Sequence, residues 1–284
     1  MTPEVTVVVP TRRPAATVAR CLAALAADAD GPAFEAIVVD DGSPEPAGLD
    51  RLAEPLPFVR VLHRVHAGVS AARNAGAGAA AAPFLAFTDD DCVPEAGWLA
   101  ALVAAAAGRE DAVVGGRVVN GCTANRYAAA SQLVLDLVYG YYDGRPGRPV
   151  CFAANNLALP AALLARVGGF DESLSFGEDR DLDERLRRAG ASFVAAPEAI
   201  VRHEKDLDAA GFVRQFFGYG RGAYRFHARE PGRARVTAGF YRRLPGAARG
   251  LDPRTLALLG LWQAANAAGF AWEAGADAVS RLRG

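Results

Sequence analysis

The sequence has little of what marks several classes of protein. It holds only four cysteines, Cys21, Cys92, Cys122 and Cys151, with no C-x-x-C pair and none beside a histidine at the spacing of metal ligands. This argues against a disulfide framework or a zinc site and favours a reducing, cytoplasmic location. With 31 basic and 32 acidic residues, the net charge is only −1. The chain has no overall excess of positive charge to attract phosphates, so a nucleic-acid partner is not expected.

Long apolar runs and targeting signals are also missing. The N-terminal residues lack the basic stretch and apolar core of a signal peptide. The nearest approach to a membrane span, residues 255–272, is interrupted by Gln263 and Asn266. What remains is a globular composition, 51% hydrophobic over 284 residues, that suits one large domain or one domain with an extension.

Short β-rich runs alternate with alanine-rich helical stretches over the first two hundred residues. Strands are expected at 5–9, 34–39, 59–62, 84–88, 112–119, 193–194 and 199–201, with an extended piece at 152–159. Helices are expected at 15–27, 70–82, 97–107, 127–138, 161–167 and 177–189, with a turn-rich piece at 141–147. Strands separated by helix-length segments predict a mostly parallel sheet with helices on both faces. From about residue 207 we expect helices joined at Pro231, Pro245 and Pro253.

Two acidic motifs stand directly after predicted strands. Asp40-Asp41-Gly42-Ser43 follows the strand at 34–39, and Asp89-Asp90-Asp91 follows the strand at 84–88. In open parallel sheets the ligand crevice lies outside the carboxyl ends of the strands, so both motifs are expected there. Carboxylates of the first motif could accept hydrogen bonds from a nucleobase imide or from ribose hydroxyls. A plain Asp-Gly turn is the alternative.

The second acidic motif indicates a cation site. Consecutive acids repel one another unless a cation offsets their charge, and Mg²⁺ or Mn²⁺ takes one or two carboxylates together with phosphate oxygens. Because alternate residues of an extended chain point the same way, Asp89 and Asp91 are expected to face one site while Asp90 points elsewhere. His203 could be a further ligand, although a lone histidine is more often packed or exposed. A solvated acidic loop is the alternative for the motif.

Basic residues are expected in the same crevice. Pro10-Thr11-Arg12-Arg13 ends the first strand and could supply backbone contacts and a cation. Arg73, near the start of the helix opened by Gly68, could pair with a diphosphate or with the nearby acids. An ordinary surface arginine is the alternative.

Glu178 and Asp179 open another predicted helix. Asp179, Leu182 and Leu186 lie at i, i+3 and i+7 and share one stripe. Asp179 is therefore expected to point inward, at a helix N-terminus that favours its ionised form. It could accept a proton there, or the two acids could simply cap the helix.

These motifs, in their order along the chain, resemble those of family 2 glycosyltransferases. The resemblance rests on the strand that ends at Pro10, on Asp40-Asp41-Gly42-Ser43, Gly68-x-Ser70-x-x-Arg73-Asn74-x-Gly76, Phe87-Thr88-Asp89-Asp90-Asp91, and Gly169-Phe170-Asp171-Glu172 with Gly177-Glu178-Asp179. It implies a GT-A fold over residues 1–205. This is an α/β architecture with a Rossmann-like mixed, mostly parallel sheet flanked by helices. Residues 206–284 would then form a helical extension for acceptor, lid or dimer contacts.

The resemblance also implies a role for each matching residue. Asp179 would be the general base, and Glu178 would help to place the acceptor. The donor would be held by residues at the strand ends and beside them: Pro10, Thr11, Arg12, Asp40, Asp41, Arg73, Asp89, Asp90 and, facing the sugar, Asn156. Mn²⁺ or Mg²⁺ would be held by Asp91, Asp89 and, as in some members, His203.

The implied activity is an inverting, metal-dependent transfer of a hexosyl or related sugar from a nucleotide-diphosphate sugar to an acceptor hydroxyl. A divalent cation would stabilise the leaving diphosphate, and a carboxylate would take the acceptor's proton. Two other functions stay open. A sugar nucleotidyltransferase would normally carry a glycine-rich loop after the first strand, which residues 10–14 lack. A non-catalytic nucleotide-sugar-binding protein would not need Asp179.

The substrates and partners are less defined. Uridine diphosphate sugars are the commonest donors among the proteins that the chain resembles, and the acceptor could be a glycan, a lipid-linked intermediate, a peptide or a small natural product. In the extension, Trp262, Phe270 and Trp272 favour packing onto the domain or a homodimer contact. Peripheral attachment to a membrane is the alternative.

Overall fold

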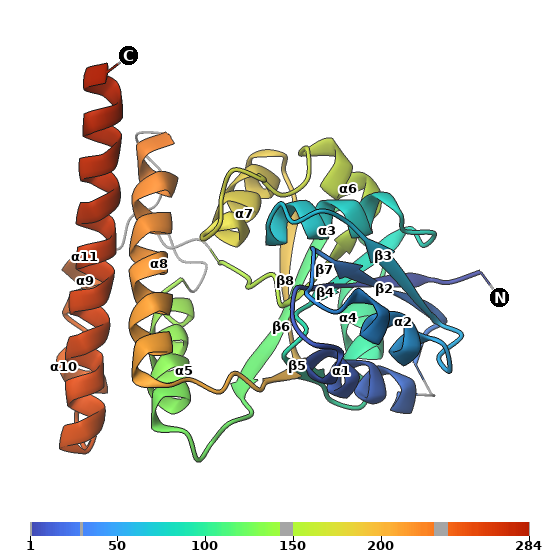
Figure 1. Ribbon diagram of the computed structural model, residues 1–284, viewed down its shortest axis with the longest axis horizontal. Helices are drawn as coiled ribbons and strands as arrows, with labels where there is room; N and C mark the ends of the chain where they lie inside the picture. Colours follow the sequence, from blue (N-terminus) through green and yellow to red (C-terminus); the bar gives the residue numbers. More distant parts are fainter. Residues whose placement is uncertain (1, 29–30, 143–149, 230–237, 284) are drawn as a thin grey trace. The chain divides into compact units, whose positions relative to one another are not determined.

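The computed structural model describes residues 2–28, 31–142, 150–229 and 238–283, and it divides the chain into two compact units (Figure 1). The first, here called the sheet unit, consists of Met1–Gly121 and Phe152–Glu204, and the second, the helical unit, of Cys122–Cys151 and Lys205–Gly284. The sequence places one boundary near residue 205 and leaves Cys122–Cys151 in the first domain. In the structure this segment belongs with the C-terminal helices. Most of the turn-rich piece at 141–147 lies outside the described residues.

The sheet unit is built on an eight-stranded sheet in the order β3-β2-β1-β4-β7-β6-β8-β5. The parallel half consists of β1 (Val5–Thr11), β2 (Phe34–Asp40), β3 (Val59–His63) and β4 (Phe84–Thr88). The other half consists of β5 (Cys92–Pro94), β6 (Ala112–Asn120), β7 (Asn156–Pro160) and β8 (Ser192–His203). In that half β6 and β8 run parallel, whereas β7 is antiparallel to both of its neighbours and β5 to β8.

Helices flank this sheet, as the alternating pattern predicts. They are α1 (Ala15–Ala27), α2 (Pro46–Ala53), α3 (Val69–Gly78), α4 (Trp98–Ala106), α6 (Ala161–Arg166) and α7 (Glu178–Arg188). The predicted α/β architecture is therefore confirmed. Two elements, α2 and β5, are not foreseen by the sequence patterns. The two short runs predicted at 193–194 and 199–201 form the single strand β8, whose register against β6 shifts at Gly116/Arg117.

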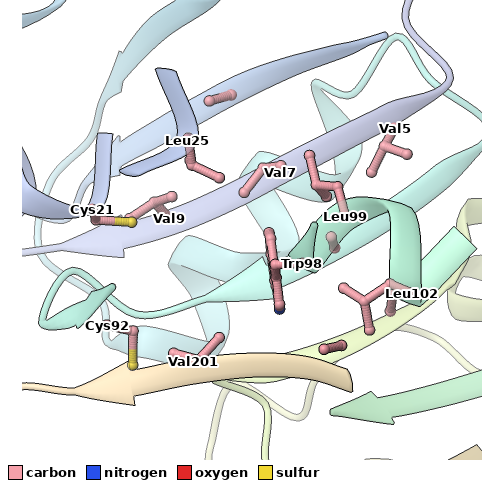
Figure 2. Packing of buried hydrophobic residues seen from close by; sticks show 14 of the residues in the cluster. Val5, Val7, Val9, Cys21, Leu25, Cys92, Trp98, Leu99, Leu102 and Val201 are labelled. Carbon is pink, nitrogen blue, oxygen red and sulfur yellow. The ribbon is translucent and has the colours of Figure 1, made fainter. Parts of the chain in front are cut away.

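The continuous apolar run of β1 reflects burial on both faces of the sheet. Val7 and Val9 belong to a cluster with Leu25 of α1 and Trp98 of α4, as Figure 2 shows. Val8 points the other way, into a second cluster with residues such as Phe87. Strands buried on both faces in this way are typical of sheets covered by helices. The core thus fixes the strand register, and with it the residues that emerge at the carboxyl ends.

The helical unit contains α5 (Arg126–Tyr139), α8 (Ala209–Arg229), α9 (Ala238–Tyr241), α10 (Leu244–Ala247) and α11 (Pro253–Arg283). Its core gathers aromatic side chains, with Phe212 and Phe216 of α8 beside Trp262 of α11. Within the described parts of the chain, no helix combines the length and apolar character needed to cross a membrane. Figure 1 shows α8 and α11 side by side, and their contacts run in the same direction along both helices.

Glycines allow α8 and α11 to pack backbone against backbone. A Cβ at Gly220 would collide with the carbonyl oxygen of Asn266, and one at Gly269 would collide with that of Phe217. We therefore expect Gly220→Ala to destabilise the helical unit by about 1–3 kcal/mol, because the added methyl forces the helices apart. The measurement is thermal or urea unfolding followed by circular dichroism.

Gly260→Ala is the matched control, because a Cβ at this position of α11 meets nothing within 4 Å. The same substitution in an open helical position should stabilise by about 0.5–1 kcal/mol. Equal effects at Gly220 and Gly260 would contradict the close helix packing.

Candidate active site

The carboxyl ends of β1, β2 and β4 bring the predicted motifs together. Thr11 at the end of β1 pairs in register with Asp40 at the end of β2, and the Asp41 N–H donates to the Thr11 carbonyl oxygen at 2.8 Å. The Thr11 hydroxyl donates to Asp90 Oδ2 at 2.7 Å, across from the end of β4. Thr11, Asp40, Asp41 and Asp90 are all at most 7% exposed. Parallel pairing thus gathers residues that lie up to 79 positions apart.

Each carboxylate of the first acidic motif is anchored by a histidine. His63 Nδ1 lies 2.8 Å from Asp40 Oδ2, and His66 Nδ1 lies 2.7 Å from Asp41 Oδ2. Burial by itself raises the pKa of Asp40, but the hydrogen bonds of His63 and the Ser43 N–H hold this pKa below its ordinary value. A carboxylate has about four lone-pair sites, so Asp40 keeps acceptor capacity for a ligand. Asp41 is more fully engaged, because it also accepts from the Ala67 and Gly68 N–H groups and lies beside Arg64.

The second acidic motif forms a tight turn in which Asp89 faces one cation and Asp90 and Asp91 face another. The Cys92 N–H donates to the Asp89 carbonyl oxygen at 3.1 Å, which closes the turn. Asp89 accepts from Arg73, whereas Asp90 and Asp91 both lie beside Arg13, with N–O distances of 3.7 and 2.9 Å. The expected alternation of an extended chain is therefore wrong, because the chain turns at this point.

The cation at the end of β1 is Arg13. The sequence predicts its neighbour Arg12 as a donor-binding residue. Both arginines are exposed, but within the described residues Arg13 pairs with the acidic turn and Arg12 does not. Which of the two reaches the turn depends on the backbone after Thr11, where the Arg13 N–H donates to the Thr11 hydroxyl oxygen. The pattern of residue types alone could not separate them.

A candidate metal centre lies at the junction of the acidic turn and the end of β8. His203 Nε2 is 3.2 Å from Asp91 Oδ1, and ligand atoms of Asp91, Cys92 and His203 all lie within 4.8 Å of one another. Antiparallel pairing of β5 with β8 sets Cys92 opposite His203, so a cysteine does meet a histidine here despite their separation in the sequence. Burial raises the pKa of the Cys92 thiol well above its ordinary value. Mg²⁺ and Mn²⁺ prefer oxygen and nitrogen ligands to a thiol, so the donor set that fits such an ion is Asp91 with His203.

Arg73 links three of the motifs. Its side chain, 4% exposed, donates to Asp89 Oδ1 at 2.8 Å and to Glu178 Oε1 at 3.0 Å, and its guanidinium lies 5.4 Å from the centre of the Phe170 ring. Gly76 of the same helix allows α3 to approach β1, since a Cβ there would collide with Val8. The predicted surface-arginine alternative is therefore wrong: Arg73 is a buried bridge between α3, the acidic turn and α7.

The neighbouring Asn74 holds the loop that precedes α7. Its amide accepts from the Phe170 N–H and donates to the Phe170 carbonyl oxygen, both at 2.8 Å. Gly169 has φ +71°, and a Cβ there would lie 2.6 Å from the Asn74 amide oxygen. The motif at 68–76 and the motif at 169–172, about a hundred residues apart, are thus held together by the hydrogen bonds of Asn74.

Glu178 and Asp179 occupy the first turn of α7, directly after Gly177 with φ +78°. Leu182 and Leu186 are fully buried on the core side of this helix, as their spacing predicts. Burial and the adjacent charge of Glu178 raise the pKa of Asp179 to about 6, although the Arg180 N–H donates to its Oδ1 at 2.7 Å. A carboxyl with this pKa is ionised at neutral pH and well suited to accept a proton.

One turn further along α7, Asp183 is a buried acid that the sequence analysis does not single out. It is 1% exposed and accepts from the Phe152 N–H at 2.8 Å, and its Oδ1 has no hydrogen-bond partner among the described residues. Burial raises the pKa of Asp183 well above its ordinary value. The sequence does offer a clue to this buried acid: Asp183 stands one helical turn after Asp179, next to Leu182 of the apolar stripe of α7.

Asp183→Asn should therefore stabilise the protein at neutral pH. A raised pKa in the folded state means that the folded protein holds the proton while the unfolded chain has lost it, so stability falls as pH rises above about 4. Asparagine removes this penalty, and we expect a gain of about 1–3 kcal/mol near pH 7 that shrinks toward pH 4. Urea unfolding of both proteins across this range tests it. A constant or reversed difference would contradict a protonated Asp183.

The family is decided by comparison with known proteins. Residues 6–159 match the model of Glycosyl transferase family 2. The chain belongs to this family. The predicted resemblance is thereby confirmed.

Similar proteins are named as glycosyltransferases. A pre-mycofactocin glycosyltransferase of Mycobacterium tuberculosis is 33% identical over 233 residues, which cover 80% of this chain and 48% of that protein. A validoxylamine A glucosyltransferase of Streptomyces hygroscopicus is 30% identical over 69% of this chain and 51% of its own length. The chain thus spans about half the length of these relatives.

Solved structures match the fold. A mannosyltransferase of Pyrobaculum calidifontis, in complex with GDP-Man and Mn²⁺, aligns with a TM-score of 0.64 at 20% identity over 99% of this chain and 80% of its own. TarS 1-349 of S. aureus aligns with a TM-score of 0.56 at 17% identity over 94% of this chain and 89% of its own. These likenesses confirm the predicted GT-A fold class.

The structure gives Asn156 a different setting from the one that the family resemblance implies. Its amide oxygen accepts from the Trp98 indole N–H at 2.9 Å, and its amide nitrogen donates to two backbone carbonyl oxygens, those of Arg117 and Ala199. The side chain is 1% exposed. Asn156 therefore stabilises the junction of β6, β7 and β8, and its buried amide is already engaged by protein groups, so it is not available to a donor sugar.

Proposed function

We propose that this family 2 chain is an inverting glycosyltransferase that moves a sugar from a nucleoside diphosphate to an acceptor hydroxyl. The observation that carries the proposal is the pair of acidic centres linked by Arg73: the acidic turn at the end of β4 and the carboxylates that open α7. One centre suits the leaving diphosphate, and the other suits the attacking hydroxyl.

The donor half of the site consists of the strand ends. Asp40 would accept hydrogen bonds from the base or the ribose, and Asp41 would hold the loop at 66–68 beside the nucleotide. Pro10 and Thr11 line the same edge of the sheet. Asp91 and His203 would hold a divalent ion, with Asp89 and Asp90 beside them. When bound, such an ion stabilises the charge that develops on the leaving diphosphate. The mannosyltransferase with the similar fold was solved with Mn²⁺, which makes Mn²⁺ the first ion to test, ahead of Mg²⁺.

The acceptor half is the first turn of α7. Asp179 would take the proton of the acceptor hydroxyl, and Glu178, fixed by Arg73, would help to position the acceptor. A single base opposite a leaving diphosphate gives direct displacement and inversion. A retaining mechanism of the double-displacement kind would instead need a second carboxylate as nucleophile.

The substrate class is proposed from the names of the relatives. Two of them are named validoxylamine A glucosyltransferase and pre-mycofactocin glycosyltransferase. These names make a hexosyl donor and a small natural-product acceptor the first pair to test. For the donor we retain uridine diphosphate as the first base to test.

The experiment is slow hydrolysis of nucleotide-diphosphate sugars followed by proton NMR, with water replacing the acceptor. We expect release of the nucleoside diphosphate, and the first free sugar should have the anomeric configuration opposite to the donor's. Retained configuration would contradict the single displacement. Release of pyrophosphate from a nucleoside triphosphate and a sugar phosphate would instead identify a nucleotidyltransferase. Nucleotide binding without any turnover, unchanged by Asp179→Asn, would identify a sensor.

A further inference from the structure

One face of α11 is exposed and apolar along nearly the whole helix. Steps of three and four residues connect Leu261, Trp272, Val279 and Leu282 through small residues, and every position on this path is exposed: Ala257, Leu261, Ala264, Ala268, Trp272, Gly275, Val279 and Leu282. Trp272 is 64% and Leu282 87% exposed. We call these eight residues the α11 stripe.

The opposite side of α11 is already occupied within the helical unit. Leu258, Trp262 and Ala265 are buried in its aromatic core, and α8 lies along the helix (Figure 1). Trp262 thus packs within the helical unit itself, whereas Trp272 is exposed. The other side of α11 is already packed in the core of the helical unit, so this continuous exposed apolar surface indicates a site of interaction with a partner.

Charge is divided unevenly between the two units. The helical unit holds 16 of the 31 basic residues but only eight of the 32 acidic ones, a formal charge of +8, whereas the sheet unit has −9. Two acids near the stripe are neutralised, because Glu273 bonds Arg221 and Arg225 and Asp277 bonds Arg281. A third, Asp252, stands just before α11 and accepts hydrogen bonds from Thr255.

Unpaired cations precede the stripe in the chain. Arg242, Arg249 and Arg254 are exposed, and no acid pairs with them among the residues that the structure describes. The exposed Tyr241 and Leu256 lie beside them in the chain. The apolar stripe is therefore accompanied by an excess of positive charge.

An apolar stripe together with excess positive charge favours one kind of partner over another. A second copy of the chain could cover the stripe, but it would bring a second charge of +8 to the same interface, and like charges oppose association. A bilayer that contains anionic lipids receives apolar side chains and attracts arginines at once. Tryptophan is also favoured at the boundary between headgroups and acyl chains. We propose that α11 lies in the surface of an anionic membrane, with the α11 stripe buried among the lipids.

The experiment is sedimentation of the full chain with vesicles of phosphatidylcholine alone or with roughly one third phosphatidylglycerol, at low and high salt. We expect binding to the anionic vesicles that weakens at least several-fold at high salt. Trp272 also provides a direct signal, because Trp98 and Trp262 are buried. Its emission should shift to the blue with anionic vesicles, and Trp272→Phe should lose this shift while still binding.

Two variants distinguish binding through the α11 stripe from non-specific adsorption to vesicles. Leu261→Glu with Trp272→Glu should reduce vesicle binding at least tenfold, whereas Val213→Glu, at an exposed apolar position of α8, should leave it within about twofold. Circular dichroism checks that each variant is folded. Equal binding by all three proteins would overturn the proposal. So would a wild-type dimer in sedimentation velocity that ignores vesicles and is broken by the double variant, which would assign the stripe to a second copy.

Discussion

Asp179→Asn should lower kcat for glycosyl transfer by about 10²–10⁴-fold, the usual contribution of a positioned general base. Asparagine keeps the size of the side chain but cannot take the acceptor's proton. Affinity for the nucleoside diphosphate should stay within a few-fold, because Asp179 is proposed to face the acceptor. The measurement is steady-state kinetics beside a nucleotide titration of both proteins.

The same helix offers a matched control. Asp183→Asn makes the identical chemical change one turn away, at a carboxyl bonded to the Phe152 N–H, and should leave kcat within about threefold. The pH dependence adds a second test. Since the pKa of Asp179 is raised to about 6, kcat/KM of the wild type should fall as pH drops below about 6. Similar losses in the two variants, or a flat acid limb, would contradict the role of Asp179.

Arg73→Met should destabilise the sheet unit by about 3–5 kcal/mol, the range for removing one partner of a buried ion pair. The side chain of Arg73 is only 4% exposed and separates Asp89 from Glu178. Without it these two acids face each other with no cation between them. Asp89 is 30% exposed, so water offsets part of the loss. Urea unfolding measures the effect.

Arg20→Met is the control for this prediction. Arg20 and Glu204 are also in close contact, 2.6 Å apart, but Arg20 is 60% exposed, and exposed pairs contribute about 0–1 kcal/mol. If Arg73→Met cost no more than Arg20→Met, the account of Arg73 as a buried bridge would be wrong.

The sequence predicts much of the sheet unit because its local patterns and its tertiary structure agree. The valine run at 5–9 is buried on both faces, and the acids after β2 and β4 emerge at one edge of the sheet, as parallel pairing requires. The inward face of α7 follows from the spacing of Leu182 and Leu186.

The details that failed depend on turns and on long-range pairing. The three acids at 89–91 form a turn, so the rule for extended chains could not assign their directions. Cys92 meets His203 only through the pairing of β5 with β8, and neither that pairing nor the place of α5 in the helical unit leaves a local signal. The choice of Arg13 over Arg12 depends on backbone angles after Thr11, which residue types do not encode.

The measurement that tests the central claim most directly is a thermal-shift panel. Uridine, thymidine, guanosine and cytidine diphosphates would each be added with and without Mn²⁺ to the wild type and to Asp91→Ala. Ligand at about 100 times its Kd adds about 2.7 kcal/mol of stability, which is enough to raise Tm visibly. The account predicts that one nucleotide raises the Tm of the wild type only when Mn²⁺ is present and has no effect on Asp91→Ala. No shift with any nucleotide, or an equal shift in Asp91→Ala, would contradict a donor site built on the acidic turn.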